Sequence, residues 1–600
     1  MERLTAVRMV LLLVFVGWLF MWVMLPTKTY KDSWKLTLSA RLGSTYFREQ
    51  GTNLLLFSFP IMFLASLGCV YLHFQKKSCP ESNLSRRSWL DSWNRPLIVM
   101  NPLGIVSAME LMFAAMFVVL LGWSLGNYLY VSFGHLHMHT ASEKLVGLTS
   151  ESSVKYHIWL GHLSMVLFTA HSVGFIIYWA ITDQMALMLE WSRTYVSNVA
   201  GEIAFILALV MWVTSIPRVR RKMFELFFYA HQTYILYLFF YIIHVGVAYF
   251  CLILPGIFLF LIDRYLRFLQ SRTNVRVVAA RLLPCDTLEL NFTKIAGLDY
   301  NPASILFLNV PSISKLQWHP FTVTSNANME PDMLTVLIKA RQEQQPDDEH
   351  HKLPKSVVLI CAFKNSADLS MLDILLPLTS NLTSRSYLSE INLEIQAYIT
   401  RETEQPLENT KKPLQTIWFK PHPSDSPISA PLGPNSWLWL CAIISSSFVM
   451  FLVLLGILTR YHIYPKERVP EGSVYNYTFK TLWDMFLVCG SVFLATSFVF
   501  LWQKKENNKK EGMKVQNLEG DHEVGEEIES VAHRSVLETT EVHFSRRPDL
   551  KSILMEKNKK GSATGVLVSG PRNMRHEVAK ICSSPNQAKN LHLEAMSFNW

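Results

Sequence analysis

The sequence predicts a polytopic α-helical membrane domain, followed by a small β-barrel and an α/β domain that a membrane hairpin interrupts. Half of the 600 residues are hydrophobic and only 17% are charged, whereas about a quarter would be charged in a typical soluble protein. The apolar residues are concentrated in discrete runs that are long enough to cross about 30 Å of hydrocarbon. After residue 270 the pattern changes to short alternating runs, which are typical of strands.

Residues 1–265 form the predicted membrane domain. Seven apolar runs in it are candidate spans, two of them short: Val7–Val23, Leu54–His73, Gly104–Leu125, His157–Trp179, Ala200–Val213, Phe224–Val247 and Val247–Ile262. If Arg218–Lys222 is cytosolic, as the positive-inside rule indicates, these spans place the basic segment Lys76–Arg95 outside. The net charge of +9 is spread over such short loops, so we expect no nucleic-acid partner.

The next two segments are predicted to be soluble. Residues 270–340 contain short alternating runs broken by Pro and Asn, which predict a small antiparallel barrel or sandwich. Residues 355–600 begin with the apolar run Val357–Phe363, which has the length of a buried strand. A helical candidate, Ser366–Leu376, follows it, and this order is typical of a strand–helix unit in an α/β domain.

The α/β domain is interrupted by a predicted membrane hairpin at residues 437–502, with spans at Trp437–Leu458 and Leu482–Trp502. Val566–Ser569 then predicts a second buried strand, and a helix is expected through Arg575–Cys582. Eight cysteines are scattered along the chain without a CxxC pair. This spacing supports neither structural zinc nor an iron–sulfur cluster.

Four histidines inside two apolar helices are the strongest functional signal. His157 and His171 are 14 residues apart in one span, and His231 and His244 are 13 residues apart in another. At the rise of an α-helix, each pair spans about 20 Å. Two such helices can face each other and hold two stacked haems, with one histidine from each helix per iron.

Helical phase supports the first pair better than the second. Fourteen residues return to within about 40° of the same face, but 13 residues leave an offset of about 140° on a straight helix. The second helix must therefore rotate locally, or reach the haems from two sides. His162 lies off the His157 face and is interpreted as a hydrogen-bonding packing residue. The run His135–His139 is equally compatible with a metal site and with a solvated loop.

The alternative for the four histidines is that they only pack helices together. An imidazole in hydrocarbon is costly without a partner, and two pairs on neighbouring spans make a purely structural role the weaker interpretation. A zinc or iron site on a helix would favour i, i+4 spacing, which neither pair shows.

The segments YHIWLGHLSMVLFTAH, FELFFYAH with the later IIH, and LFLIDRYLRFLQSR resemble those of plant ferric-chelate reductases, the ferric reduction oxidases. This family is related to the NADPH oxidases, and the resemblance extends over nearly the whole chain. It implies two b-type haems as cofactors. By that resemblance His157 and His231 hold the inner haem, and His171 and His244 hold the outer one.

The tetrapeptide His319-Pro320-Phe321-Thr322 resembles the flavin-binding signature of this family. The resemblance implies FAD as a cofactor and a ferredoxin-reductase-like barrel as the fold of residues 270–340. The Thr322 hydroxyl and the neighbouring backbone can contact a flavin. The alternative is an ordinary edge strand, where proline is tolerated.

Two short motifs resemble the nucleotide side of the same family and imply NAD(P)H as electron donor. Arg547, in an Arg-Arg-Pro run, could grip a ribose phosphate with two hydrogen bonds. Ser569-Gly570-Pro571 is the second motif, in which relatives usually begin with cysteine. The closing Phe598–Trp600 resembles the terminal aromatic residue that shields a flavin ring in related reductases.

Two stretches are shorter than the resemblance implies, and we interpret both as internal deletions. Only 17 residues separate Lys339 from Val357, where relatives carry more of the flavin domain and a glycine-rich loop. That loop is missing from the sequence, so the α/β domain is predicted to be an incomplete nucleotide-binding domain, because a phosphate cradle requires close approach of backbone N–H groups. The second stretch is the 31-residue connection Gly126–Tyr156, where relatives have a further helix.

The resemblance implies a ferric-chelate reductase that takes electrons from cytosolic NAD(P)H through FAD and two haems to an external Fe(III)-chelate. Two alternatives stay open. One is an NADPH-oxidase-type enzyme that forms superoxide. The other is a truncated, non-catalytic isoform that binds haem only. The expected partners are membrane lipid and the ferric chelate, together with either a second copy of this chain or a full-length relative. The absence of an organellar signal favours the plasma membrane.

Overall fold

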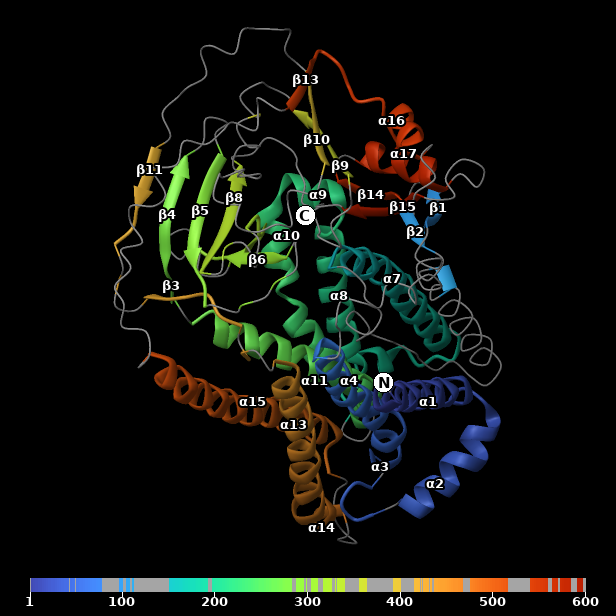
Figure 1. The fold of residues 1–600 in the computed structure, drawn as a ribbon. Helices are drawn as coiled ribbons and strands as arrows, with labels where there is room; N and C mark the ends of the chain where they lie inside the picture. Colours follow the sequence, from blue (N-terminus) through green and yellow to red (C-terminus); the bar gives the residue numbers. More distant parts are fainter. Residues whose placement is uncertain are drawn as a thin grey trace. The chain divides into compact units, whose positions relative to one another are not determined.

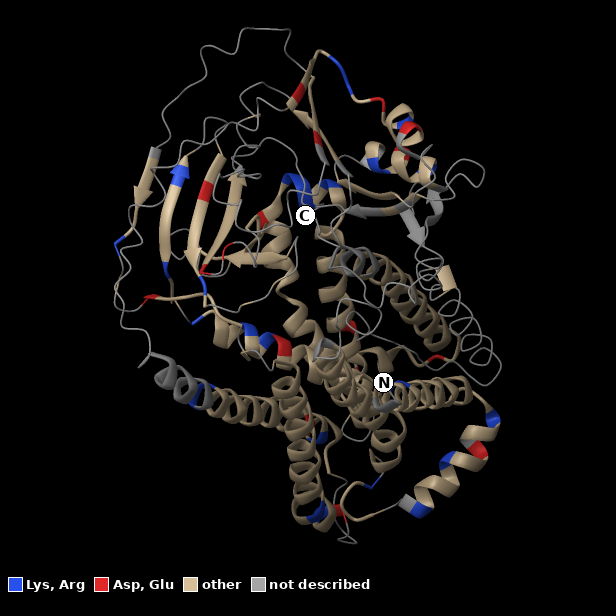
Figure 2. Ribbon diagram, in the orientation of Figure 1, with Lys and Arg blue, Asp and Glu red and all other residues tan. Residues whose placement is uncertain are grey.

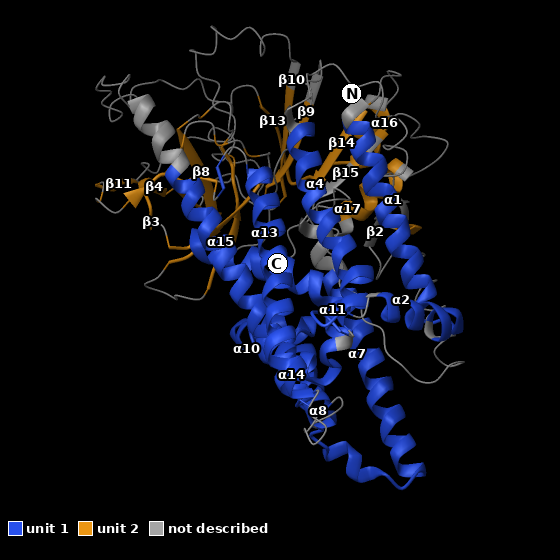
Figure 3. Ribbon diagram, turned by 90° about the horizontal axis from the view of Figure 1, so that it is seen from below, with its two compact units in different colours: residues 1–84, 113–270, 431–509 blue, residues 85–112, 271–430, 510–600 orange. Residues whose placement is uncertain are grey.

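A computed structural model describes residues 2–77, 96–112, 150–339, 356–369, 392–400, 415–515, 540–558, 564–583 and 591–596, with short gaps inside several of these ranges. The chain divides into two compact units, coloured separately in Figure 3. Unit 1 contains residues 1–84, 113–270 and 431–509, and unit 2 contains residues 85–112, 271–430 and 510–600. Each unit is described by itself.

Unit 1 is built from α-helices (Figure 1). Its main helices are α1 (Glu2–Met24), α2 (Lys35–Leu42), α3 (Gln50–Asn53), α4 (Phe59–Lys77), α7 (Ser150–Ile181), α8 (Asn198–Thr214), α9 (Pro217–Lys222), α10 (Phe224–His231), α11 (Tyr234–Gln270), α13 (Ser436–Leu458), α14 (Tyr464–Glu467) and α15 (Tyr477–Val515). Among the residues that the structure describes, seven helical segments are long and apolar enough to cross a membrane. The chain is an integral membrane protein, and its long helices carry few charges along their length (Figure 2).

The predicted spans agree with these helices in all but one place. Ala200–Val213 forms α8, an apolar helix that is shorter than the others. The run Gly104–Leu125 was predicted as a span, but its first four residues form strand β2 (Gly104–Ser107), paired with β1 (Pro96–Met100). The β-branched residues Ile98, Val99, Ile105 and Val106 in these two strands explain the pairing, because such residues favour strands. Residues 113–125 lie outside the described part of the chain.

Helix α11 consists of two antiparallel helices joined at Gly246. This residue has φ +69° and ψ −179°, a backbone conformation that is essentially restricted to glycine. The rings of Tyr234 and Phe260, on either side of the turn, have centroids 5.8 Å apart, so the two halves lie against each other. The turn lies within one residue of Val247, where the sequence divides one predicted span from the next.

The ends of unit 1 can be named from these contacts. We call the end at Gln270 and Ser436, where the chain passes to and from unit 2, the linker end, and the opposite end the far end. Helix α15 runs parallel to the second half of α11, since Tyr477 lies against Gly246 and Tyr265 bonds Ser497 at 2.7 Å. Gly246 and Tyr477 therefore lie at the far end.

The orientation of α4 corrects a prediction. Phe47 lies beside Gly456, and the Ser445 hydroxyl donates to Ser66 at 3.1 Å. Helix α4 therefore runs antiparallel to α13 and ends at the linker end. The basic α9 lies at the same end, because it precedes the first half of α11. The basic segment after Gln75 thus begins on the same side as α9, not on the opposite side. A single span at Gly104–Leu125 would not allow this.

Unit 2 contains the predicted barrel-like sheet and the predicted parallel strands. The antiparallel sheet has the order β11-β4-β5-β8, and β6 pairs with β7: β4 is Val277–Leu282, β5 Thr287–Thr293, β6 Ile305–Leu308, β7 His319–Thr322, β8 Met333–Lys339 and β11 Gln415–Trp418. A further two-stranded sheet pairs β3 (Asn274–Val275) with β12 (Asp425–Ser426). Apolar side chains of β5, β7 and β8 pack in one core around Phe292 and Val336.

The α/β part of unit 2 has two parallel sheets. One has the order β13-β10-β9, with β9 Ser356–Phe363, β10 Asn392–Ile399 and β13 Thr540–Phe544. The other pairs β14 (Thr564–Ser569) with β15 (Leu591–Met596), and helices α16 (Leu550–Asn558) and α17 (Arg572–Ser583) accompany them. The strands predicted at Val357–Phe363 and Val566–Ser569, and the helix through Arg575–Cys582, are confirmed. The predicted helix Ser366–Leu376 lies almost wholly outside the described residues.

Candidate functional site

The four predicted histidines meet as two pairs inside unit 1. His157 and His171 lie on α7, His231 is the last residue of α10, and His244 lies just before the turn in α11. The ring centroids of His157 and His231 are 6.1 Å apart. Those of His171 and His244 are 6.3 Å apart. Each pair therefore takes one imidazole from α7 and one from the helices that follow α9.

A break between α10 and α11 lets both His231 and His244 face α7. The amide of Gln232 donates to the carbonyl of Tyr229, and that of Thr233 donates to Ala230, each at 3.2 Å. These bonds reach back three residues instead of four, so the chain is wound more tightly between α10 and α11. The local rotation that the 13-residue spacing requires is located here.

The spacing of each pair is suited to one metal ion between two imidazoles. A metal–imidazole bond is about 2.0 Å long, so two nitrogens on opposite sides of one ion lie about 4 Å apart and their ring centroids about 6 Å apart. Among the described residues, no group of three or more His, Cys, Asp or Glu side chains is arranged to hold a metal. Each pair thus offers two nitrogen ligands and no carboxylate or thiolate.

His244 is held by helix α8. Its Nδ1 lies 3.0 Å from the carbonyl oxygen of Ser197. Because a carbonyl only accepts, Nδ1 carries the proton and Nε2 keeps its lone pair, which is the usual way a second partner fixes a metal-binding imidazole. A Cβ on Gly201 would lie 2.6 Å from Nδ1 of the same ring. Only glycine at this position leaves room for the imidazole.

Two other imidazoles lie in contrasting surroundings. Nδ1 of His231 is buried and has no hydrogen-bond partner among the described residues. The indole N–H of Trp212 donates to Nδ1 of His162 at 2.8 Å, which confirms His162 as a hydrogen-bonding packing residue between α7 and α8.

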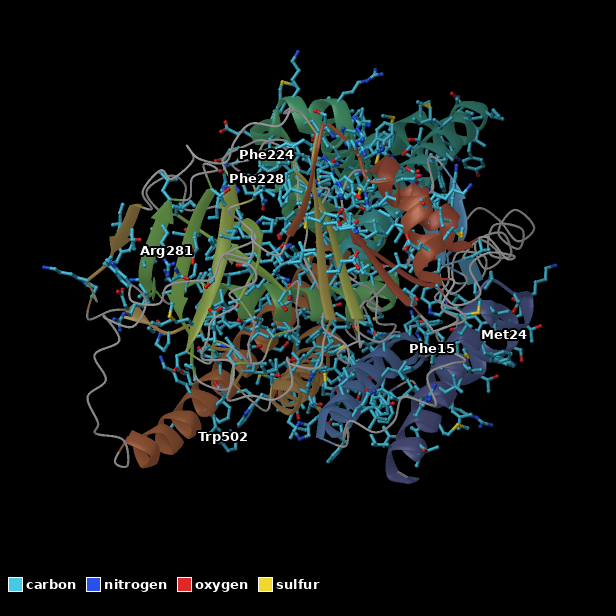
Figure 4. The ribbon with its side chains drawn as sticks, turned by 45° about the horizontal axis from the view of Figure 1, so that its top comes forward. Phe15, Met24, Phe224, Phe228, Arg281 and Trp502 are labelled. Carbon is cyan, nitrogen blue, oxygen red and sulfur yellow. The ribbon has the colours of Figure 1, made fainter. Side chains whose placement is uncertain are left out.

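Phe224 and Phe228 on α10, labelled in Figure 4, stack with ring centroids 6.3 Å apart. The run His135–His139 lies outside the described residues.

The predicted flavin tetrapeptide is strand β7 of the barrel-like part of unit 2. It pairs antiparallel with β6, so that His319 is opposite Leu308 and Thr322 is opposite Ile305. His319 is exposed, whereas Pro320, Phe321 and Thr322 are half-buried, and Phe321 packs against the sheet core. Position and register agree with the predicted strand.

Buried polar side chains lie on β5 and β8, in the barrel-like part of unit 2. The Asn291 amide donates to Glu289 at 3.1 Å, and the Thr335 hydroxyl donates to Asn291 at 2.7 Å. Arg281, labelled in Figure 4, lies 3.9 Å from Glu289. Burial raises the pKa of Glu330, which lies beside Thr335, above its usual value. This network satisfies the side-chain polar groups of Asn291 and Thr335, whereas Oε2 of Glu289 has no hydrogen-bond partner among the described residues.

The predicted nucleotide-side residues lie at the ends of strands in two sheets. Arg547 is exposed and follows β13, and Ser569 is the last residue of β14. Gly570, Pro571 and the closing Phe598–Trp600 lie outside the described residues. The ends of parallel strands are where α/β sheets bind ligands. The structure therefore puts Arg547 and Ser569 at the ends of strands in two separate sheets.

Three family models match the chain. A ferric reductase-like transmembrane component matches residues 103–242, an FAD-binding domain matches residues 272–371, and a ferric reductase NAD-binding domain matches residues 331–583. The first contains His157, His171 and His231, and the second contains β7. These matches show a transmembrane domain with flavin- and nucleotide-binding domains after it.

Similarity to curated proteins decides the family. Ferric reduction oxidase 4 and Ferric reduction oxidase 5 of Arabidopsis thaliana are each 45% identical to this chain, with 99% of the chain and 99% of each relative covered. The chain belongs to the ferric reduction oxidase family. It is therefore an oxidoreductase, and the family predicted from its sequence is confirmed. A shorter similarity, 28% over 143 residues and 23% of the chain, relates this ferric reduction oxidase to a superoxide-generating NADPH oxidase heavy chain of Dictyostelium discoideum, of which it covers 28%.

The alignment also bears on the predicted deletions. It extends over 707 positions with the first relative, whereas this ferric reduction oxidase has 600 residues. At least 107 positions therefore pair a residue of the relative with no residue of this chain. Because both proteins are covered almost to their ends, these missing positions are internal.

Sequence reasoning missed two residues of the site. Ser197 contributes only its backbone carbonyl, and Gly201 contributes only the space left by its missing side chain. No residue type at position 197 would have indicated this role. Gly201 did carry a signal, since a glycine in an apolar helix often marks a place where another group approaches closely.

Proposed function

We propose that this ferric reduction oxidase is a transmembrane ferric-chelate reductase that passes electrons from cytosolic NAD(P)H, through FAD and two b-type haems, to an external Fe(III)-chelate. The observation that carries the proposal is the pairing of His157 with His231 and of His171 with His244, at 6.1 and 6.3 Å between ring centroids. Haem iron with two axial imidazoles transfers electrons without an open coordination site.

The donor set fits a haem at each pair. Two neutral imidazoles face each other, and the spacing agrees with the roughly 6 Å that one iron between two such rings requires. The Ser197 carbonyl keeps the proton of His244 on Nδ1, and so leaves Nε2 to bind the iron. We assign His157 and His231 to the inner haem, at the linker end, and His171 and His244 to the outer haem, at the far end.

The remaining site residues act around the other two cofactors. We propose that His319, Pro320, Phe321 and Thr322 on β7 bind FAD, and that Arg547 and the segment Ser569–Pro571 contact NAD(P)H. The FAD-binding and NAD-binding family matches over residues 272–371 and 331–583 support these assignments. We further propose that the protein works at the plasma membrane, with either a second copy or a full-length relative as partner.

A non-catalytic isoform is the second candidate, and a specific observation favours it. The internal positions missing relative to Ferric reduction oxidase 4 include, by the family resemblance of the sequence, the glycine-rich loop between Lys339 and Val357. Such a loop normally lets backbone N–H groups reach a phosphate. Without it, the protein could bind haem and still fail to accept NAD(P)H.

Coupled turnover tests the proposed function. The full chain, purified in lipid nanodiscs and supplied with haem and FAD, is expected to oxidise NADPH or NADH and to form two Fe(II) per nucleotide from Fe(III)-EDTA. Superoxide is measured in parallel with Fe(III) omitted. A high superoxide yield with little Fe(II) would support the oxidase alternative. Haem binding without any nucleotide oxidation would support the non-catalytic isoform.

Gly201→Ala is expected to lower the haem content from two towards one per chain. The added methyl would lie 2.6 Å from Nδ1 of His244, so the ring must leave its position, while His157 and His231 are not touched. Haem is quantified against protein after purification. Gly174→Ala is the matched control, because it lies on α7 near His171 with open space around its Cβ position. Equal haem loss in both variants would show that displacement of the His244 ring is not the cause.

A further inference from the structure

Cationic side chains gather at the far end of unit 1. We define the cationic cluster as Arg48, Arg460, Lys466 and Lys480, together with the carboxylate Glu467. Both Arg48 and Lys480 form ion pairs with Glu467. The guanidinium carbons of Arg48 and Arg460 lie 5.7 and 5.5 Å from the ring centroid of Tyr464, which brings two like charges onto one aromatic ring.

Lysine and aromatic side chains extend the cluster. Lys466 lies 5.3 Å from the ring centroid of Tyr475, and its ammonium group donates to Nε2 of His462 at 3.3 Å. The ring of His462 is in turn 6.2 Å from that of Trp483, whose indole N–H donates to the Tyr475 hydroxyl at 3.1 Å. These contacts hold the cations against a group of aromatic rings.

The cationic cluster has more positive side chains than carboxylates to pair with them. Glu467 pairs with Arg48 and Lys480, and Asp484 interacts with Lys480 from one turn further along α15. Among the described residues no carboxylate pairs with Arg460 or Lys466. Arg48 has 40% of its side chain exposed. The described residues of the cluster and its surroundings thus have two more cations than carboxylates, and Arg460 and Lys466 are left to pair with an anion from outside the chain.

The position of these cations is unusual for a membrane protein. The segments 25–50 and 459–480 contain nine Lys and Arg against four Asp and Glu, although loops on the external side are normally poor in Lys and Arg. Under the proposed function the far end is the external side, because the linker end leads to the flavin- and nucleotide-binding unit.

The cluster is close to the outer histidine pair. Tyr477 packs against Gly246, two residues after His244, and Lys480 follows Tyr477 by one turn of α15. A ligand bound to Lys480 would therefore be within a short distance of the pair that we assign to the outer haem. A reducible anion bound here would be near the proposed outer haem.

We propose that the cationic cluster binds the substrate, and that the substrate is a ferric chelate with net negative charge, carried by carboxylate groups. This inference rests on the proposed function. The planar guanidinium of Arg460 can bind a chelate carboxylate through two hydrogen bonds, and the surplus positive charge attracts anionic complexes over neutral ones.

Binding of a redox-inert analogue tests the proposal separately from turnover. Ga(III)-EDTA, which has the charge and shape of Fe(III)-EDTA, is titrated calorimetrically into the full chain in nanodiscs of neutral phosphatidylcholine. Arg460→Gln is expected to weaken binding about fivefold, the effect of one charge contact of about 1 kcal/mol. Glu467→Gln is expected to strengthen it by a similar factor, since it removes the negative charge that pairs with Arg48 and Lys480.

Two controls distinguish an effect of side-chain charge on binding from an effect of lost structure. Lys35→Gln, at an exposed position of the far end outside the cluster, should leave Ga(III)-EDTA binding unchanged. The neutral tris(acetohydroxamate) complex of Ga(III) should bind each variant like the wild type. Both folded variants should keep their haem.

Three results would overturn the proposal. One is that Ga(III)-EDTA does not bind the wild type. Another is that Arg460→Gln and Glu467→Gln shift its affinity in the same direction. The third is that the variants alter binding of phosphatidylserine nanodisc lipid but not of the chelate, which would make the cluster a lipid headgroup site. If Ga(III)-EDTA binds as expected but Fe(III)-EDTA is not reduced, the docking site holds and the proposed function fails.

Discussion

His171→Ala is expected to remove one of two haems and to abolish electron transfer to ferric chelate. His171 and His244 form the far-end pair, with ring centroids 6.3 Å apart, and each iron that we assign to this protein has one histidine from α7. Losing the α7 ligand leaves a haem with one axial imidazole inside an apolar bundle. The pair His157 and His231 is not in contact with the change, so the inner haem should stay.

The measurement is a reduced-minus-oxidised absorbance spectrum with haem quantification per chain. The low-spin haem signal should fall to about half, and Fe(II) formation should fall to background. His162→Ala is the matched control on the same helix, since His162 bonds Trp212 and not a second histidine. This variant should retain both haems. Two haems in His171→Ala, or equal loss in both variants, would contradict the assignment.

Gly246→Ala is expected to prevent the two halves of α11 from closing against each other. The φ of +69° and ψ of −179° cost an alanine about 1–3 kcal/mol. The new Cβ would also collide with the ring of Tyr477, which adds to this cost. Because His244 lies two residues before the turn, the outer pair should be lost together with thermal stability.

Thermal unfolding followed by size-exclusion fluorescence, with haem content measured on the same sample, checks this expectation. Gly256→Ala is the control, because this glycine lies in the second half of α11 and nothing is within 4 Å of its Cβ position. The double variant Gly246→Ala/Tyr477→Ala should recover part of the stability, since it removes the collision but not the backbone strain. No recovery would mean that the backbone conformation alone sets the cost.

The membrane helices and the histidine pairs were accessible from sequence because both depend on local pattern. An apolar run of about 20 residues has few structures available to it in a membrane, and the 14-residue spacing on α7 follows from helix geometry alone. The 13-residue spacing of His231 and His244 was compatible with pairing only if the helix was interrupted. The tight turns at Gln232 and Thr233 supply that interruption, and no residue pattern identified their position.

The errors have a different origin. The predicted span Gly104–Leu125 begins too early, because its first four residues form a strand in a hairpin with Pro96–Met100. Strand and helix compete for short apolar runs. The predicted outside position of the Lys76–Arg95 segment followed from counting that span. Strand β10, with alternating Leu393, Ile395 and Ala397, was not predicted, although its pattern was visible.

Contacts between distant segments explain the rest. The space at Gly201 is occupied by His244, 43 positions away in the sequence. Arg48 and Lys480 share Glu467, although more than 400 residues separate the two cations. Neither relation has a local pattern, because both depend on how the late hairpin packs against the first helices.

Electron transfer through the helical bundle requires two irons, each held by two imidazoles. Haem extraction from the purified wild-type chain, together with low-temperature electron paramagnetic resonance of the oxidised protein, tests this most directly. We predict two haems per chain, both low-spin with bis-imidazole ligation. A chain that stays free of haem when expressed with ample porphyrin, or that binds haem in a high-spin state with an open coordination site, would contradict it.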